Sequence, residues 1–281
     1  MSCRENEKLA VQQKQREIFV RMQIPVNITR YLFKRFETKI LLYSGGTDST
    51  LLLSILNNYQ LVKGDGQRLL DDLDFIVFNN TRMEFPETIS YIRKVLAALK
   101  VEDKLVIIKP TKTRKELEQM IKEDLEKARG KKHDKSLYRC CYYSKKKPMK
   151  NYLKEHDLDK ESTVMLRGLR AVESSVRMMS TLQQLERGHF YCFQWKHTKN
   201  AYASDPIRYV NNQEKKKWLL AFCNKYKIDY PSVTGCSICP IFYKYANKRE
   251  QKTEQYRKML SFFGQDSIES FIDFSGVESE T

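Results

Sequence analysis

The sequence predicts an α/β fold: an open, mostly parallel sheet with helices on both faces, followed by a helical, cysteine-bearing C-terminal part. Short apolar runs alternate with amphipathic segments through residues 37–204, and such alternation is typical of parallel sheets covered on both faces. From about residue 205 the alternation ends. We therefore expect an N-terminal helical segment at 1–36, an α/β domain at 37–204 and a helical part at 205–281.

The individual elements follow from length and apolar spacing. Residues 4–22 carry apolar side chains at helical spacing, and Pro25 is expected to end this helix. Four apolar runs are expected to be buried parallel strands, at residues 39–43, 75–79, 104–110 and 163–169. Helices are expected at 49–59 and 86–100, the second beginning at Pro86, whose missing N–H is tolerated in a first turn.

Composition and length exclude several classes of protein. No apolar run reaches the ~20 residues that a membrane-spanning helix needs, so no membrane segment is expected. The N-terminal residues are charged and lack an apolar core, which excludes a secretory signal, so the protein is expected to be cytoplasmic. Seven cysteines, an odd number, argue against a disulfide framework in such a protein and for metal or sulfur chemistry.

The net charge of +16 is concentrated in one segment. Residues 127–150 hold ten Lys or Arg residues and one Asp, together with three tyrosines and two adjacent cysteines. Basic side chains neutralise phosphates, and aromatic rings stack on exposed bases. The segment therefore favours a polyanionic macromolecular substrate over a single nucleotide. A solvated surface segment is the alternative.

The apolar run at 39–43 ends abruptly in the glycine loop, Ser44-Gly45-Gly46-Thr47-Asp48-Ser49. Glycines let a backbone approach a ligand closely, and the N-terminus of the following helix offers N–H groups to an anion. The hydroxyl groups add donors, and Asp48 can lie near a metal ion bound to phosphates. The Gly-Lys-Ser/Thr of the lysine-bearing P-loop is missing. An ordinary serine-rich turn between strand and helix is the alternative interpretation.

Five stretches, in order along the chain, resemble a known family. SGGTDS in the glycine loop resembles the pyrophosphate loop of the ATP pyrophosphatases, which split ATP between its α and β phosphates. Four others are similar to motifs of the phosphoadenylyl-sulfate (PAPS) reductase family: FNNTRMEFPET at 78–88, CCYYSKKKP at 140–148, GLRAVESSVR at 168–177 and GCSICP at 235–240. The resemblance spans about residues 38–242 and implies an adenine-nucleotide α-hydrolase-like fold that binds ATP and Mg²⁺.

The resemblance also implies the site residues. Those expected at the reaction centre are Asp48, Ser49, Arg170 and Arg177. Those expected to bind the nucleotide are Ser44, Gly45, Gly46, Thr47, Asp48, Ser49, Asn80, Thr81 and Gly168. Arg170 and Arg177 fall at positions where the family's arginines face phosphate. For Glu173, between them, an exposed salt bridge on a helix is an equal alternative.

The chain departs from the family pattern in two respects. Asn80 and Arg82 replace the Asp and Gly that usually precede the family's FPET stretch. Reductases of activated sulfate usually have a modified phosphate loop and a reactive cysteine near the C-terminus, whereas this chain keeps the ATP-type loop and its last cysteine is Cys239. A reductase is therefore disfavoured.

Cys140, Cys141, Cys236 and Cys239 are the expected metal ligands. Four thiolates can hold zinc or a [4Fe–4S] cluster, and adjacent cysteines are awkward ligands for one tetrahedral zinc. The resemblance to the family's iron–sulfur members, which use the same CC…CxxC arrangement, favours the [4Fe–4S] cluster. Zinc and free thiols are the remaining alternatives.

The resemblance implies an ATP pyrophosphatase that adenylates a nucleic-acid group, which a sulfur nucleophile then attacks with release of AMP. The expected reaction is DNA backbone phosphorothioation, with DNA preferred to tRNA as substrate and a cysteine desulfurase as sulfur donor. No membrane partner is expected, and a homo-oligomer is compatible with this interpretation. The alternatives are a tRNA-thiolating enzyme, an iron–sulfur reductase of adenylylated sulfate and a non-catalytic nucleotide-sensing module.

Overall fold

The structure is a computed structural model that describes residues 21–58, 67–128, 139–159, 161–194 and 201–229. These residues fall into two compact units. The first contains the described residues within 1–79, 90–108 and 149–230, and the second those within 80–89, 109–148 and 231–281. Among the helices of the described residues, none is long and apolar enough to cross a membrane.

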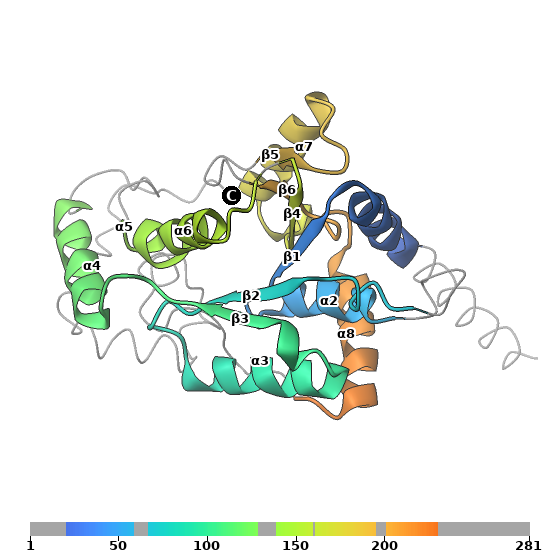
Figure 1. The fold of residues 1–281 in the computed structure, drawn as a ribbon, viewed down its shortest axis with the longest axis horizontal. Coiled ribbons are helices and arrows are strands. Elements are labelled where there is room, and N and C mark those ends of the chain that lie inside the picture. Colours follow the sequence, from blue (N-terminus) through green and yellow to red (C-terminus); the bar gives the residue numbers. More distant parts are fainter. Residues whose placement is uncertain (1–20, 59–66, 129–138, 160, 195–200, 230–281) are drawn as a thin grey trace, which may run out of the picture. The chain divides into compact units, whose positions relative to one another are not determined.

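The first unit is built on a six-stranded sheet with the order β3-β2-β1-β4-β6-β5 (Figure 1). Its strands are β1 (Thr38–Leu42), β2 (Phe75–Asn79), β3 (Leu105–Ile108), β4 (Thr163–Arg167), β5 (Phe193–Gln194) and β6 (Tyr202–Ser204). All neighbouring strands are parallel except β5 and β6, which are antiparallel. The open, mostly parallel sheet that the sequence predicts is confirmed.

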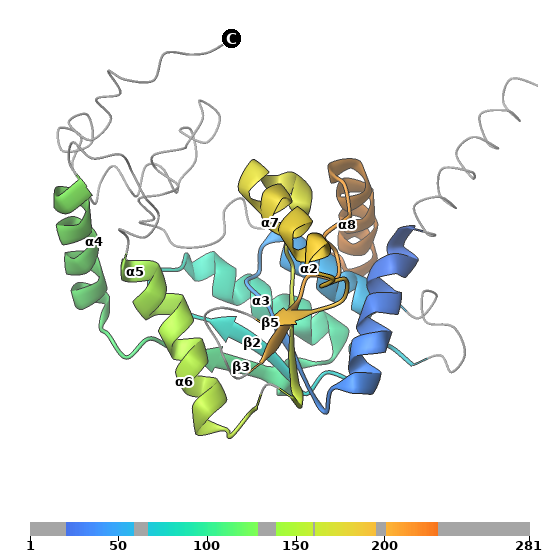
Figure 2. The same ribbon diagram turned by 90° about the horizontal axis from the view of Figure 1, so that it is seen from above.

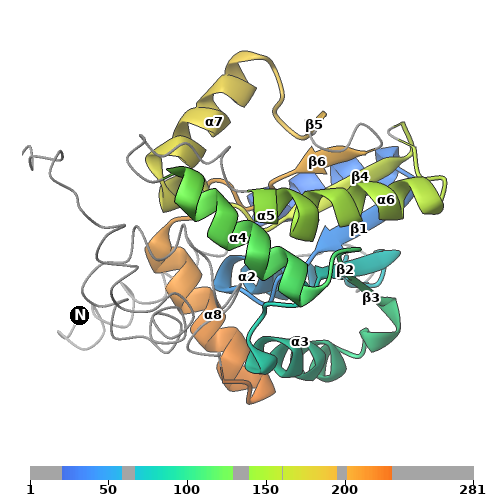
Figure 3. The same ribbon diagram turned by 90° about the vertical axis from the view of Figure 1, so that its left-hand side faces the viewer.

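Helices cover both faces of this sheet. The principal helices of the first unit are α2 (Thr47–Leu56), most of α3 (Pro86–Leu99) and α6 (Lys147–Glu155), α7 (Ser175–Glu186) and α8 (Asn212–Tyr226). Helix α4 (Arg114–Ala128) belongs to the second unit. Figures 1 and 3 show α3 and α6, most of whose residues belong to the first unit, on opposite sides of β2 and β3. Ile40, Val77 and Met165 share a buried cluster with Leu153 of α6. Because successive strand residues point to opposite faces, Leu41 is buried on the other face of the sheet.

The four expected strands and the two helices between them are confirmed to within a few residues. β5 and β6 were not predicted, because two or three residues are too few to show an alternation of apolar and polar positions. Both strands lie beyond β4 in the sheet, and β6 pairs with β4 in parallel.

The expected end of the N-terminal helix at Pro25 is wrong. Within the described residues a helix covers 21–35 and passes through Pro25. Met22, Val26 and Leu32 of this helix are completely buried, and this packing outweighs the one backbone hydrogen bond that Pro25 cannot donate. Figure 2 shows the helix at 21–35 near α8, and Arg21 forms an ion pair of 2.8 Å with Glu214 there. The rest of the helix expected at 4–22 lies outside the described residues.

The second unit contains α4 and a short helical stretch around the adjacent cysteines. α5 (Arg139–Cys141) leads directly into a π-helix at Tyr142–Lys146. The backbone N–H and the Nε of Arg139 donate to Asp124 of α4 at 2.8 and 2.7 Å, and its Nη2 donates to Glu123 at 2.9 Å. These charge-assisted bonds hold the start of α5 against α4.

Candidate active site

The order of the strands places two loops of the first unit side by side. β2 and β4 pair with opposite edges of β1, so the direction in which the sheet grows reverses at β1. Open α/β sheets bind ligands at such a switch point, beyond the carboxyl ends of the strands. Leu42 and Arg167, the last residues of β1 and β4, are register partners. The glycine loop and the loop that begins at Gly168 therefore leave the sheet together.

The glycine loop is closed by its own hydroxyl groups. Gly45 has a φ of 71°, a left-handed conformation that glycine adopts without strain. The Ser49 Oγ donates to the Gly46 carbonyl at 3.0 Å and lies 3.1 Å from the Ser44 Oγ. Gly46 is the N-cap of α2, and no side chain among the described residues caps that helix. The N–H groups of its first turn are therefore available to an anion.

Gly168 is required by a close approach to the glycine loop. A Cβ at this position would lie 2.5 Å from the Ser49 Cα and 2.6 Å from the Ser49 backbone nitrogen. Those distances are shorter than any side chain tolerates, and both involve backbone atoms, which cannot turn away. The two loops can pack this closely only because residue 168 has no side chain.

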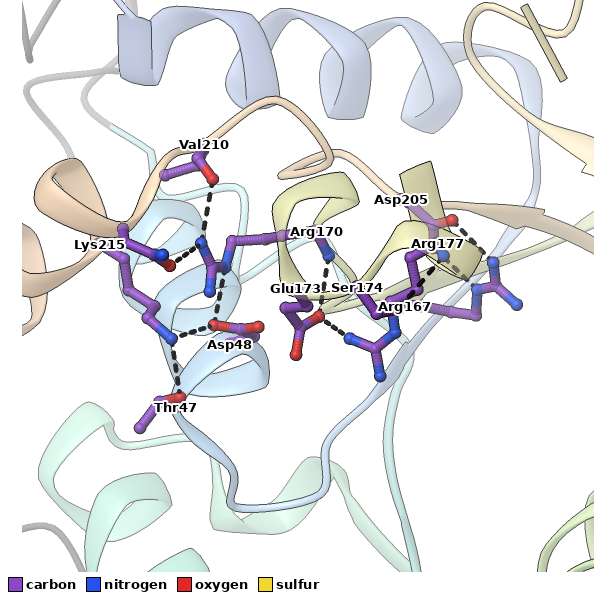
Figure 4. Close-up of polar contacts among 11 residues, drawn as sticks. Thr47, Asp48, Arg167, Arg170, Glu173, Ser174, Arg177, Asp205, Val210 and Lys215 are labelled. Atoms are coloured by element: carbon purple, nitrogen blue, oxygen red, sulfur yellow. Dashed lines mark hydrogen bonds and ion pairs between the residues drawn. The ribbon is translucent and has the colours of Figure 1, made fainter. Parts of the chain in front are cut away.

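An ion pair between Asp48 and Arg170 joins the two loops (Figure 4). The Arg170 Nε donates to the Asp48 Oδ1 at 2.9 Å, and the side chains are only 2% and 9% exposed. The Arg170 Nη1 also donates to the Val210 carbonyl at 3.2 Å and to the Asn212 Oδ1 at 2.9 Å. The guanidinium therefore links the glycine loop to the start of α8.

Two residues of the site were missed by the sequence analysis, Lys215 and Asp205. The Lys215 Nζ lies 2.9 Å from the Asp48 Oδ1 and donates to the Thr47 Oγ1 at 3.3 Å. Asp205, just after β6, accepts two bonds from Arg167, at 2.8 and 2.7 Å. Neither residue belongs to a stretch with a recognisable motif, and Lys215 is one of three consecutive lysines.

The side chains of the site carry more positive than negative charge. Its cations, Arg167, Arg170, Arg177 and Lys215, face the carboxylates of Asp48, Glu173 and Asp205. Glu173 pairs with Arg177 and accepts a bond from the Arg170 backbone N–H, so its alternative as a salt-bridge residue is the one that the structure supports. Burial lowers the pKa of Arg177, whereas Asp48 and Asp205 raise it. The glycine loop with these cations is called the anion site below.

Asp48 is the carboxylate that the sequence assigns to Mg²⁺. Its Oδ1 accepts from both Arg170 and Lys215, and its Oδ2 has no partner among the described residues. Proteins commonly hold Mg²⁺ through one or two carboxylates together with the phosphates of the substrate. The donor set therefore fits a Mg²⁺ ion that Asp48 would help to hold, with the phosphates of a bound ligand as its main partners.

The other two expected nucleotide-binding residues, Asn80 and Thr81, belong to the second unit. The buried Thr81 hydroxyl donates to the Glu84 Oε1 at 3.0 Å, and the Asn80 Oδ1 accepts from the Arg82 N–H at 2.9 Å. Burial raises the pKa of Glu84, against the opposing effects of Lys145 and Thr81. Arg82 replaces the family's glycine and adopts a φ of 63°, the conformation that a glycine adopts more readily. Roles of Asn80 and Thr81 in nucleotide binding stay predictions.

The adjacent cysteines also lie in the second unit. Cys140 is buried and Cys141 is partly buried. A hydrogen bond from Cys140, helped by the charges of Lys145 and Lys146, lowers the pKa of Cys141 to about 6, although burial opposes this shift. Such thiols are poised to lose their protons and bind a metal. Cys236 and Cys239 lie outside the described residues, within which no group of three or more His, Cys, Asp or Glu could hold a metal ion.

The π-helix that follows these cysteines is itself made largely of tyrosines and lysines. Tyr142 is 45% exposed, and its ring contacts that of Tyr143 edge-on at 5.2 Å between centroids. The Nζ atoms of Lys112 and Lys147 lie 5.5 and 5.4 Å from the centre of the Tyr143 ring, within the range of cation–π attraction. Residues 139–147, the described core of the basic stretch, are called the basic segment.

Among the solved structures that match this chain, three have low sequence identity and TM-scores below 0.5. PAPS reductase from Candida auris, in a phosphate complex, is 17% identical with a TM-score of 0.48, over 75% of this chain and 87% of that one. FMN adenylyltransferase from Candida glabrata, in complex with FAD and inorganic pyrophosphate, is 16% identical with a TM-score of 0.44. This match covers 75% of this chain and 60% of that one. The U34-tRNA thiolase NcsA from Methanococcus maripaludis, with its [4Fe-4S] cluster, is 14% identical with a TM-score of 0.43. This match covers 94% of this chain and 82% of that one.

A comparison with curated protein sequences found no match. The comparison with protein families did: residues 38–241 match the phosphoadenosine phosphosulfate reductase domain. The match begins at β1 and includes the glycine loop, the Gly168–Arg177 loop and all four of the expected metal-binding cysteines. It also covers well over half of the chain. The chain therefore belongs to the phosphoadenosine phosphosulfate reductase domain family.

Proposed function

We propose that the chain is an ATP pyrophosphatase that adenylates a group on nucleic acid and so prepares it for sulfur insertion. The observation that carries this proposal is the anion site, in which an uncapped helix N-terminus lies beside cations with a net positive charge. A helix N-terminus with free N–H groups suits a phosphate, and arginines suit its planar pairs of oxygens. Membership of a family named for sulfur chemistry supports the same direction.

The proposed reaction begins when an oxygen of the acceptor attacks the α-phosphorus of ATP. The bond between the α-phosphorus and the bridging oxygen breaks, and pyrophosphate leaves with that oxygen and its electron pair. The N–H groups of the glycine loop bind the leaving phosphates, and Asp48 would hold a Mg²⁺ ion that offsets their charge. Oriented donors at the place where negative charge develops are an effective means of stabilising a transition state.

A sulfur nucleophile then attacks the adenylated group. The bond that breaks is the one between the acceptor atom and the oxygen now attached to AMP, so the former acceptor oxygen leaves as part of AMP. AMP is a much better leaving group than oxide, and this difference is the reason to use ATP. We propose a cysteine desulfurase as the source of the sulfur, which it delivers as a persulfide. The outer sulfur of the persulfide attacks as AMP leaves, and a thiol reductant then cleaves the S–S bond, which leaves the sulfur on the acceptor and a disulfide as the oxidised product.

We propose a phosphate of the DNA backbone as the acceptor group. The basic segment supports a polyanionic substrate, because its lysines and the exposed Tyr142 combine the two features that bind phosphates and bases. Pyrophosphate release is expected to increase when DNA is added and not when tRNA is added. Stimulation by tRNA alone would show that the substrate is tRNA.

The test of the reaction is an analysis of products from ATP and Mg²⁺ with the purified full chain, with and without nucleic acid. We expect AMP and pyrophosphate. Ser49→Ala is expected to lose this activity, because the Ser49 hydroxyl closes the glycine loop through the Gly46 carbonyl. Ser180→Ala, which removes an exposed serine hydroxyl on α7, is the matched control. Formation of ADP and orthophosphate would contradict the proposal.

We also propose that Cys140 and Cys141, together with Cys236 and Cys239, hold a [4Fe–4S] cluster. The lowered pKa of Cys141 supports thiolate ligation at this pair. Protein purified without oxygen is expected to be brown and to contain about four irons per chain, as for a cluster held by four cysteines. Cys140→Ser is expected to bleach it, whereas Cys223→Ser is the control. Stoichiometric zinc without iron would overturn this assignment.

A further inference from the structure

Lys215 comes from a distant part of the chain and brings a positive charge to the glycine loop. It lies in the first turn of α8, and its Nζ is 2.9 Å from the Asp48 Oδ1 and 3.3 Å from the Thr47 Oγ1. Its side chain is 21% exposed, so the ammonium group is partly shielded but still reaches solvent. The ammonium group lies at the beginning of α2, and the glycine loop before this helix lacks the lysine of a P-loop.

α8 is anchored so that Lys215 has one well-defined place. At its start, the Asn211 side chain and the Glu214 side chain cap the helix reciprocally, with both bonds at 2.9 Å. Along its length, the Trp218 Nε1 donates to the Ser54 Oγ of α2 at 2.9 Å. Near its end, the Tyr226 hydroxyl accepts from the Asn57 Nδ2 at 2.6 Å. These bonds fix α8 against α2, whose N-terminus carries Thr47 and Asp48.

Lys215 also faces space that a ligand can occupy. With Thr47 it lines a cavity of about 590 Å³. The rest of the described lining is mostly apolar, with Leu219, Leu220, Cys223 and Ile228, and its charged members are Lys216, Lys227 and Asp229. Ligand cavities commonly have volumes of about 300–1,000 Å³. The features of this space that suit an anion are therefore the Lys215 ammonium and the Thr47 hydroxyl beside it. An ion pair that served only to neutralise Asp48 would need no such space beside it.

We propose that Lys215 contacts the terminal phosphates of the nucleotide, so that the departing pyrophosphate lies between the glycine loop and the part of the cavity that Lys215 and Thr47 line. This inference rests on the proposed function. In a P-loop, a lysine within the motif reaches the β and γ phosphates. Here the same charge comes from α8, and Asp48 holds it in place between Arg170 and the loop. When the bond from the α-phosphorus breaks, negative charge grows on the departing pyrophosphate, which the Lys215 ammonium offsets.

The test is calorimetric titration of the full chain with inorganic pyrophosphate and, separately, with AMP. Lys215→Gln is expected to weaken the binding of pyrophosphate at least about tenfold, the range of a missing hydrogen bond to a charged group, and to leave the binding of AMP unchanged. Lys217→Gln removes the same charge from an exposed position on the same helix and is expected to behave as the wild type. Lys215→Arg keeps the charge and is expected to recover part of the affinity.

The outcomes separate this inference from the proposed function. If Lys215→Gln binds pyrophosphate as the wild type does, or weakens pyrophosphate and AMP equally, the role of Lys215 is structural and the inference is wrong. If the wild type binds neither AMP nor pyrophosphate, the proposed function fails and the inference fails with it. Thermal unfolding of each variant shows whether it is folded, and Lys215→Arg provides the comparison if Lys215→Gln is not.

Discussion

Around the glycine loop, Arg170 and Lys215 both bond Asp48, whereas in the basic segment Lys147 lies over a tyrosine ring. The first arrangement is buried: the Arg170 side chain is 2% exposed. The second lies at the surface, with Tyr142 exposed. The two units therefore place positive charge in two different ways, although both are candidates for binding phosphate.

The difference indicates what each region can recognise. Removing charges from water is expensive, and a buried ion pair often adds little to stability over an apolar pair of the same volume. At the anion site, the buried ion pairs hold each cation in a fixed position. Fixed cations suit a small ligand, because its reacting atom must be aligned. Surface lysines have long, mobile side chains and suit a backbone that is bound at many points along its length.

The largest expected effect comes from removing the buried guanidinium. Arg170→Ala leaves the Asp48 carboxylate with Lys215 as its remaining partner, and breaking a buried pair in this way commonly costs about 3–5 kcal/mol in the free energy of unfolding. Arg177→Ala is the comparison, because its side chain is 41% exposed and exposed pairs contribute about 0–1 kcal/mol. Denaturant unfolding of both variants measures the difference. Equal decreases would contradict the distinction between buried and exposed pairs in this site.

A smaller decrease in stability is expected at Gly168. Gly168→Ala places a methyl group 2.5 Å from the Ser49 Cα, so the loops must separate, and overpacking of this kind costs about 1–3 kcal/mol. Because the displaced backbone belongs to the glycine loop, release of pyrophosphate is expected to fall as well. Gly188→Ala meets nothing within 4 Å but has a φ of 73°, so it tests backbone strain alone. An equal fall of activity in both variants would exclude the close approach to Ser49 as the cause.

The glycine loop and the strands around it could be predicted from sequence because their signals are local. The run at 39–43 is mostly apolar, and the left-handed φ of Gly45 is one that glycine adopts without strain. The approach of this loop to a ligand stays a prediction. The resemblance singled out Arg170 for phosphate contact and Gly168 for nucleotide binding, and these roles stay predictions. The structure shows what the two residues do within the chain: Arg170 bonds Asp48, and Gly168 allows a close approach to Ser49.

Lys215 could not be predicted, because its role depends on the packing of α8. Lys215, Lys216 and Lys217 follow one another in the sequence, and a charge run alone indicates a solvated helix face. The bonds that fix α8 against α2, such as the one between Trp218 and Ser54, turn the helix so that the first of the three lysines reaches Thr47 and Asp48. The wrong end assigned to the N-terminal helix at Pro25 has the same origin, since buried packing there outweighed a local signal.

The smallest expected effect on stability, and the sharpest test of the comparison, comes from the basic segment. A triple variant with Lys145→Gln, Lys146→Gln and Lys147→Gln is expected to change the free energy of unfolding by no more than about 0.5 kcal/mol, as is usual for surface positions. Its affinity for DNA is expected to fall, and the slope of log K against log salt to become shallower by roughly 0.9 for each phosphate that the lysines no longer neutralise. ATP cleavage without nucleic acid is expected to persist, because the anion site is unchanged.

The matched control removes three exposed lysines of the first unit, with Lys34→Gln, Lys94→Gln and Lys154→Gln. If both triple variants flatten the salt dependence equally, DNA responds to the overall charge of the chain, and the basic segment has no special part in binding it.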